Sequence, residues 1–222
     1  MGRPKTGGGR PIAYRLADGT KVPGVTTIIG RYKDSGGLIR WAYNCGRDGI
    51  DMDAARDSAA DAGSLVHHWI DQVIHGQERT TPEKYDQEAA AKALVGFGAF
   101  LQWRDQMKLE VLSTETPLVS EGLRYGGTYD AVALVAGKRV LLDWKGSNAI
   151  YPEYVVQLAA YRRLLLENGE DDVTSGYLLR VGKNWGDFHA HSWPLPVLDR
   201  AFRQFELYRE SYDGEAMLKE VV

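Results

Sequence analysis

Two aspartates and a lysine near the middle of the sequence have the types and spacing of a metal site. Asp143 and Lys145 come shortly after the apolar run 140–142, and Asp130 lies a short distance upstream. Side chains alternate between the two faces of a strand, so Asp143 and Lys145 should point the same way. Divalent metals bind carboxylate oxygens, activate water and stabilise charge on phosphoryl oxygens. These residues therefore indicate a divalent-metal site for phosphodiester cleavage.

Each of these residues has an expected role. The carboxylates of Asp130 and Asp143 would bind the metal, and the backbone carbonyl of Trp144 is a further candidate ligand. Lys145 would orient the attacking water or help to deprotonate it, and would neutralise developing charge. Each residue alone also has a simpler interpretation: an ion pair between Asp143 and Lys145, and turn chemistry at Asp130 beside the glycine pair 126–127. The surrounding motifs must decide between these interpretations.

Two polar side chains follow on a predicted helix. Gln157 and Tyr161 are four residues apart, so they share one helix face. From beside a metal site they could bind the substrate phosphate or Lys145. A solvated or partly buried helix face is the alternative interpretation.

Two upstream residues are further candidates. His67 follows Gly63 at helical spacing and could bind metal through a neutral imidazole, although a histidine on an apolar face is more often a core residue. Glu115 lies on a predicted strand and could face the site as a carboxylate that positions water. A solvated strand face is its alternative. The other histidines show no ligand spacing with an acid or a cysteine: His68, His75, His189 and His191.

Hydrophobic periodicity and turn signals predict the elements that must position these residues. We expect a hairpin at 12–22, a strand or helix start at 25–29, and helices at 38–45, 51–75 and from 81 to about 108. We then expect strands at 110–120, 124–135 and 139–145, a helix at 152–167, strands at 175–181 and 188–193, and a helix at 197–218. Antiparallel strands followed by a crossover helix and another strand predict a mixed α/β sheet.

Length and composition limit the interpretations further. A chain of 222 residues is expected to form a single domain over 11–222, after a flexible basic tail at 1–10. A net charge of −3 argues mildly against nucleic-acid binding, although local patches matter more than the sum. Cys45 is the one cysteine, which excludes an internal disulfide framework and fits a reducing compartment. No apolar stretch has the length of a membrane span, so we expect no membrane association.

Taken together, four motifs resemble the PD-(D/E)XK nuclease superfamily, in particular its RecB-like branch. That branch contains the mitochondrial genome maintenance exonuclease, Cas4-type nucleases and many phage exonucleases. In order, the motifs are Gly-x-x-x-His, Gly-x-x-Asp, Asp-x-Lys and Gln-x-x-x-Tyr, which here end at His67, Asp130, Lys145 and Tyr161. The resemblance covers nearly the whole chain and is specific as a set, although each motif is weak alone.

The resemblance implies a restriction-endonuclease-like core: a mixed central sheet ordered helix, three strands, helix, strand, flanked by helices, with an N-terminal helical region. It also implies a deoxyribonuclease that depends on Mg²⁺ or Mn²⁺. The implied metal ligands are His67, Asp130, Asp143 and the carbonyl of Trp144, and the implied catalytic lysine is Lys145. The implied supporting residues are Gln157 and Tyr161, and the candidate nucleic-acid contacts are Ser147, Tyr151 and Arg162.

The sequence departs from the family pattern at two points. The family lysine is usually followed by Thr or Ser, whereas here Gly146 stands between Lys145 and Ser147. Some members hold an iron–sulfur cluster on four cysteines, which one cysteine cannot do, so no iron–sulfur cluster is expected.

The first functional hypothesis is an exonuclease acting on DNA ends in phage-type recombination, replication or repair. Its expected partners are DNA and a single-strand annealing or single-strand-binding protein, and its expected location is the cytoplasm of a bacterium or a phage-infected host. The alternatives are a structure-specific or restriction-like endonuclease, and a non-catalytic DNA-binding module on a nuclease fold. Circular and linear substrates would distinguish the two enzymes. The presence of Asp130, Asp143 and Lys145 argues against the binding module.

Overall fold

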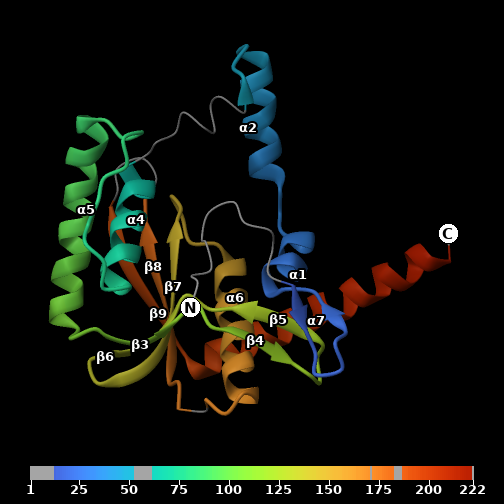
Figure 1. Cartoon of the computed structure of the whole chain (residues 1–222). Coiled ribbons are helices and arrows are strands. Elements are labelled where there is room, and N and C mark those ends of the chain that lie inside the picture. Colours follow the sequence, from blue (N-terminus) through green and yellow to red (C-terminus); the bar gives the residue numbers. More distant parts are fainter. Residues whose placement is uncertain (1–12, 53–61, 171, 183–186, 222) are drawn as a thin grey trace.

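A five-stranded sheet lies at the centre of the computed structural model, which describes residues 13–52, 62–170, 172–182 and 187–221 (Figure 1). Its strands, in sheet order, are β3 (Glu110–Thr114), β6 (Ala131–Val135), β7 (Lys138–Gly146), β8 (Ser175–Val181) and β9 (Phe188–Pro194). The central strand, β7, is the one that carries the Asp-x-Lys motif.

Strand pairing confirms the expected mixed sheet. β3, β6 and β7 pair antiparallel, β7 and β8 pair parallel, and β9 returns antiparallel to β8. Parallel neighbours need a crossover connection, and helix α6 (Pro152–Glu167) lies between β7 and β8 in the chain. The register places Asp143 opposite Leu178 and Lys145 opposite Arg180.

Helices cover both faces of the sheet and form two separate hydrophobic layers (Figure 1). The first layer contains α6 together with α1 (Val25–Tyr32) and α7 (Leu195–Glu220). The second layer contains α4 (Ala62–Ile74) and α5 (Gln87–Gln106).

Side chains of β7 alternate between these layers. Leu141 belongs to the α6 layer, whereas Leu142 and Trp144 belong to the α4 layer. Both leucines are fully buried, and each such burial contributes about 1.5–3 kcal/mol. The apolar part of the strand therefore fixes its orientation, and the alternation directs Asp143 and Lys145 toward the α6 layer.

Three smaller elements surround the main sheet. A hairpin is formed by β1 (Tyr14–Arg15) and β2 (Lys21–Val22), and a second two-stranded sheet by β4 (Pro117–Ser120) and β5 (Tyr125–Thr128). Helix α2 (Gly36–Arg47) extends away from the sheet in Figure 1. Within the described residues, no helix is long and apolar enough to cross a membrane.

A glycine on β5 allows α6 to approach closely. A Cβ atom at Gly127 would lie 2.6 Å from a ring carbon of Tyr161, which is far inside van der Waals contact. The glycine of the Gly-x-x-Asp motif is thus required by the tyrosine of the Gln-x-x-x-Tyr motif.

Two strand predictions are wrong in extent, because 110–120 and 124–135 each divide into two strands. The first divides at Glu115, whose φ of 46° lies in the left-handed region, where a strand cannot continue. The second divides at Tyr129 and Asp130. β4 and β5 then pair with each other outside the main sheet. Hydrophobic alternation continues through both breaks, so the sequence pattern does not show them.

The helix predicted from residue 81 is wrong in its first turn, since α5 begins at Gln87. Asp86 is the N-cap, and its side chain accepts a hydrogen bond from the Ala89 N–H at 2.7 Å. The capping aspartate therefore sets the start of the helix in place of Pro82. For residues 25–29 the sequence left a strand and the start of a helix as alternatives, and the chain forms helix α1 there.

Parts of other predictions lie outside the described residues. The helix predicted at 51–75 is confirmed from Ala62 to Ile74, but 53–61 are not described. The predicted tail at 1–10 is also outside the described residues, so the division into a tail and a single domain stays a prediction.

Candidate active site

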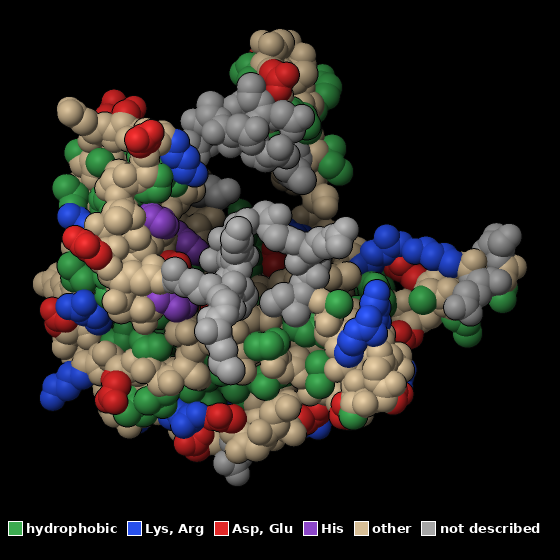
Figure 2. Space-filling view, viewed as in Figure 1, with side chains coloured by type: hydrophobic (Ala, Val, Ile, Leu, Met, Phe, Trp, Pro, Cys, Tyr) green, Lys and Arg blue, Asp and Glu red, His purple; other side chains and the backbone are tan. Residues whose placement is uncertain are grey.

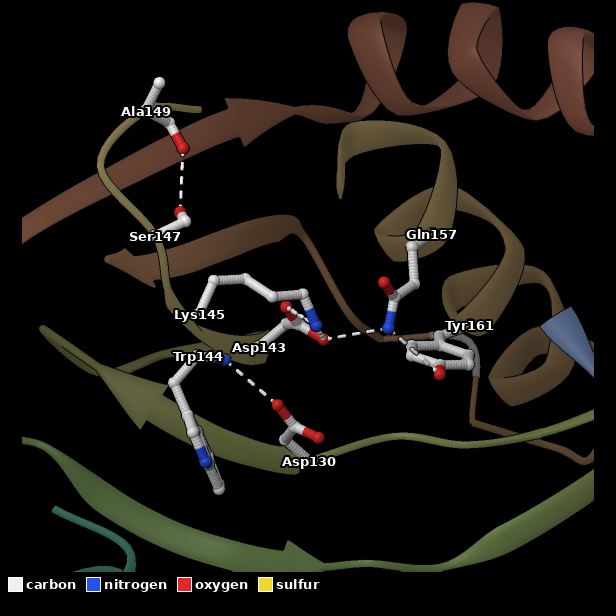
Figure 3. Close-up of polar contacts among 8 residues, drawn as sticks. All are labelled: Asp130, Asp143, Trp144, Lys145, Ser147, Ala149, Gln157 and Tyr161. Atoms are coloured by element: carbon white, nitrogen blue, oxygen red, sulfur yellow. Dashed lines mark hydrogen bonds and ion pairs between the residues drawn. The ribbon is translucent and has the colours of Figure 1, made fainter. Parts of the chain in front are cut away.

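Asp143 and Lys145 meet at the end of β7 (Figure 3). Lys145 Nζ lies 2.8 Å from Asp143 Oδ2 and donates to Oδ1 at 3.0 Å. Asp143 is completely buried, whereas 22% of the Lys145 side chain is exposed. A buried carboxylate is strongly destabilising without a partner, and Lys145 provides that partner for Asp143.

Asp130 adds a second carboxyl group to this pair. Its Oδ2 accepts a hydrogen bond from the Trp144 N–H at 3.0 Å. Burial, followed by the negative charge of Asp143, raises the pKa of Asp130 from its usual 3.8 to about 8, although Lys145 opposes the rise. The two carboxyl groups are close enough to hydrogen-bond, and in the metal-free protein Asp130 favours its protonated form.

The carboxyl pair fits a divalent cation. Asp143 Oδ2 is buried and accepts no hydrogen bond of good geometry, although it lies 2.8 Å from Lys145 Nζ. A cation bound by both carboxylates would replace the proton of Asp130 and use this oxygen. Hard oxygen ligands suit Mg²⁺ and Mn²⁺.

Helix α6 supplies two further members of the site. Gln157 Nε2 donates to Asp143 Oδ1 at 3.2 Å and approaches the Tyr161 hydroxyl at 3.1 Å (Figure 3). Burial, and then the charges of Asp143 and Asp130, raise the pKa of Tyr161 well above 10, so the phenol stays protonated. Gln157 therefore donates its hydrogen bond to the Asp143 carboxylate. The expected protein partner of Gln157 was Lys145.

His67 reaches the same strand end from α4, on the opposite face of the sheet. Its ring lies 6.4 Å from the Trp144 ring between centroids and makes a hydrogen bond with the Trp144 backbone. Burial lowers the pKa of His67, and nearby Lys145 lowers it further, while Asp71, the Trp144 backbone and Asp143 oppose the change. The neutral imidazole, which is the form that binds metal, is therefore favoured.

Glu115 lies beside this group but points elsewhere. Its N–H donates to the Asp130 carbonyl at 3.1 Å, whereas its carboxylate lies 3.9 Å from His75 Nε2 on the α4 side. The backbone thus links Glu115 to Asp130, and its side chain belongs to a second cluster.

The structure does not direct the three candidate nucleic-acid contacts to one place. The Ser147 hydroxyl is buried and donates to the Ala149 carbonyl at 2.7 Å (Figure 3). Tyr151 is 43% exposed, with the Lys33 ammonium 5.7 Å from its ring centroid. Arg162 forms an ion pair with Asp199 of α7 at 2.7 Å. Their contacts with nucleic acid stay predictions.

Two residues near the lysine do not appear among the candidates from the sequence. Arg180 of β8 is the register partner of Lys145, and its guanidinium donates to the Ser147 carbonyl at 3.0 Å. The Tyr154 ring centroid lies 5.8 Å from Lys145 Nζ. An arginine in the otherwise apolar run 178–181 was the available signal for the first.

No family model and no curated protein matches this chain. Among solved structures, a candidate exonuclease from Eubacterium rectale aligns with a TM-score of 0.47 and 15% identity over 66% of this chain and 64% of that chain. The alkaline exonuclease of Laribacter hongkongensis, in complex with dAMP, aligns with a TM-score of 0.37 and 13% identity over 73% of this chain and 89% of that chain. The chain thus spans 64% of the length of the first structure. Similarity this weak carries no argument about function. The functional argument therefore rests on the geometry of the site.

Proposed function

We propose that this protein is a metal-dependent deoxyribonuclease that hydrolyses phosphodiester bonds at DNA ends. The observation that carries the proposal is the pairing of Asp130 and Asp143, which are buried together beside Lys145. Two carboxyl groups buried beside each other repel when both are charged, and together they are a suitable ligand set for a divalent cation.

Mg²⁺ or Mn²⁺, when bound, would supply an activated water and a Lewis acid for the scissile phosphate. Asp130 and Asp143 would hold the ion through their carboxylates, and His67 would present a neutral ring nitrogen from the other face of the sheet. The Trp144 carbonyl stays a proposed ligand.

Lys145 provides a fixed positive charge at the site. Burial acts to lower the pKa of Lys145, but Asp143 and Asp130 outweigh it, so the net shift is upward and the ammonium stays charged. Because Asp143 holds this group in place, it can neutralise charge on a phosphoryl oxygen and donate to the attacking water.

Gln157 and Tyr161 position the carboxylate. The Gln157 amide holds Asp143 Oδ1, and the Tyr161 hydroxyl lies within hydrogen-bonding distance of the same amide. Asp143 is therefore oriented by Lys145 on its own strand and by Gln157 on the crossover helix.

The preference for DNA ends, and a place in phage-type recombination beside a single-strand annealing or single-strand-binding protein, are supported by the motif resemblance. A structure-specific endonuclease would use the same residues. A non-catalytic DNA-binding module would not need Lys145 in its present place.

The test is degradation of end-labelled linear DNA, single- and double-stranded, with Mg²⁺, Mn²⁺ or EDTA. We expect metal-dependent release of label by the wild type and by Lys138→Ala, a control at an exposed lysine on the same strand. Asp143→Asn and Lys145→Ala should release none. Nicking of circular DNA would favour the endonuclease instead. A folded wild type that cleaves no substrate would refute the enzyme and leave the binding module.

A further inference from the structure

A second group of metal-binding side chains lies outside the carboxyl pair. Asp71 and His75, at the end of α4 and directly after it, face Glu115 in the turn between β3 and β4. One ligand atom from each residue lies within 4.8 Å of the other two. In Figure 2, histidine side chains gather over α4 beside a central hollow in which acidic atoms are visible.

The hydrogen bonding of His75 leaves one ring nitrogen without a partner. Nδ1 lies 2.8 Å from the Asp71 backbone carbonyl, which can only accept, so Nδ1 carries a hydrogen. In the neutral ring Nε2 then presents a lone pair. That atom is buried without a hydrogen-bond partner and faces a Glu115 carboxylate oxygen 3.9 Å away.

A cation between the two residues would satisfy both groups. A lone pair and a carboxylate that face each other repel, and 3.9 Å is too long for a hydrogen bond from a protonated ring. Two metal–ligand bonds of about 2.1 Å span at most about 4.2 Å, so one ion can reach both Nε2 and the Glu115 oxygen across 3.9 Å.

The backbone holds Glu115 in a strained conformation that directs its side chain toward α4. Its φ of 46° lies in the left-handed region, which is unfavourable for a residue with a Cβ atom. The hydrogen bond from its N–H to the Asp130 carbonyl, at 3.1 Å, fixes the turn. Strain of this kind persists where the surrounding structure requires the side chain in one place.

We propose that Asp71, His75 and Glu115 bind a divalent transition-metal ion, with Zn²⁺ as the best match, at a site separate from the carboxyl pair of Asp130 and Asp143. Two carboxylates and an imidazole suit Zn²⁺ better than Mg²⁺, which prefers oxygen ligands alone. The ion would connect α4, which carries His67, to the turn that is hydrogen-bonded to Asp130. The proposal stands on these contacts and does not require that the protein be a nuclease.

The test measures Zn²⁺ stoichiometry by titration calorimetry and by metal analysis after dialysis. The parent protein is Asp130→Asn/Asp143→Asn, which lacks both carboxylates of the first site. We expect it to bind one Zn²⁺ per chain and to unfold at a higher temperature with Zn²⁺ than without. In that background, Glu115→Gln and His75→Gln should each weaken binding at least tenfold and remove the thermal shift.

The control is His189→Gln, a histidine on β9 whose side chain is 56% exposed. It should bind Zn²⁺ as the parent does. Circular dichroism checks that each variant is folded, and Asp71→Asn replaces any variant that is not. No Zn²⁺ bound by the folded parent, or unchanged affinity in the folded Glu115 and His75 variants, would overturn the proposal. Because DNA cleavage is not the readout, failure here is distinguishable from failure of the proposed function.

Discussion

Asp130→Asn should stabilise the metal-free protein at alkaline pH, because the fold disfavours a charge on this carboxyl group. Burial, and then the charge of Asp143, raise the pKa of Asp130 from 3.8 to about 8. The folded state therefore binds this proton more tightly than the unfolded chain does. The resulting stabilisation is fully present below about pH 4 and is lost progressively as the pH rises to about 8.

The structure sets the magnitude. At about 1.36 kcal/mol per pKa unit, the rise from 3.8 to about 8 gives an upper bound of about 5–6 kcal/mol. Part of this energy belongs to the coupled pair with Asp143, so we expect about 2–4 kcal/mol at about pH 8.5. Asparagine keeps an acceptor for the Trp144 N–H and carries no charge. For a chain of this size the Tm should rise by roughly 5–15 °C.

The assay is thermal and urea unfolding in EDTA at about pH 4.5, 6.5 and 8.5. Wild type and Asp130→Asn should have similar free energies of unfolding at the lowest pH and diverge as the pH rises. Asp105→Asn, at a side chain that is 68% exposed, should follow the wild type. Mg²⁺ should stabilise the wild type at high pH but not Asp130→Asn. If Asp130→Asn is the less stable protein at pH 8.5 in EDTA, the reasoning about the carboxyl pair is refuted.

Three other substitutions test separate parts of the structure. Gly127→Ala places a Cβ 2.6 Å from a Tyr161 ring carbon, so it should lower the free energy of unfolding by about 1–3 kcal/mol in urea and reduce DNA cleavage. Lys145→Met leaves the fully buried Asp143 without its ion-pair partner and should lower the free energy of unfolding of the metal-free protein by about 3 kcal/mol. Adding Asp143→Asn to this variant should restore much of the lost free energy in the same assay. Asp86→Ala removes the α5 N-cap and should cost about 1 kcal/mol by urea unfolding, without changing cleavage.

Each of these has a matched control or a contrary result. Gly122→Ala, with open space at its Cβ position, should be far milder than Gly127→Ala. Additive effects in the double variant of Lys145 and Asp143 would show that the two side chains do not interact. Loss of cleavage in Asp86→Ala with unchanged stability would place α5 in the reaction, contrary to the present assignment.

The sequence predicted the strand of the Asp-x-Lys motif because that strand is fixed by local chemistry. The apolar run 140–142 must be buried on both faces, so period-two alternation carries Asp143 and Lys145 to a shared face. In the same way, the four-residue spacing of Gln157 and Tyr161 predicted a shared helix face. Spacing does not show which acceptor a side chain reaches, and Gln157 bonds Asp143.

The sequence could not predict features that depend on backbone breaks or distant partners. The left-handed φ of Glu115 gives no hydrophobic signal, yet it divides a predicted strand and turns a carboxylate toward α4. The expectation that His75 has no ligand spacing with an acid was wrong, because Asp71 lies one helical turn before it. Their third partner, Glu115, is remote in the sequence and is supplied only by the fold. The sequence offered both Pro82 and Asp86 as residues at which the helix could begin. The hydrogen bond from the Ala89 N–H to the Asp86 side chain makes Asp86 the N-cap of α5.

The site receives residues from both hydrophobic layers, His67 from the α4 side and Gln157 from the α6 side. These layers are separated by the sheet, so we expect each to open locally as its own cooperative unit in the metal-free protein. An ion held by His67 and Asp143 together would bind only when both layers are docked. Metal binding would therefore couple the opening of the two layers, so that amide hydrogens in α4 and in α6 exchange at a common, slower rate in the metal-bound protein.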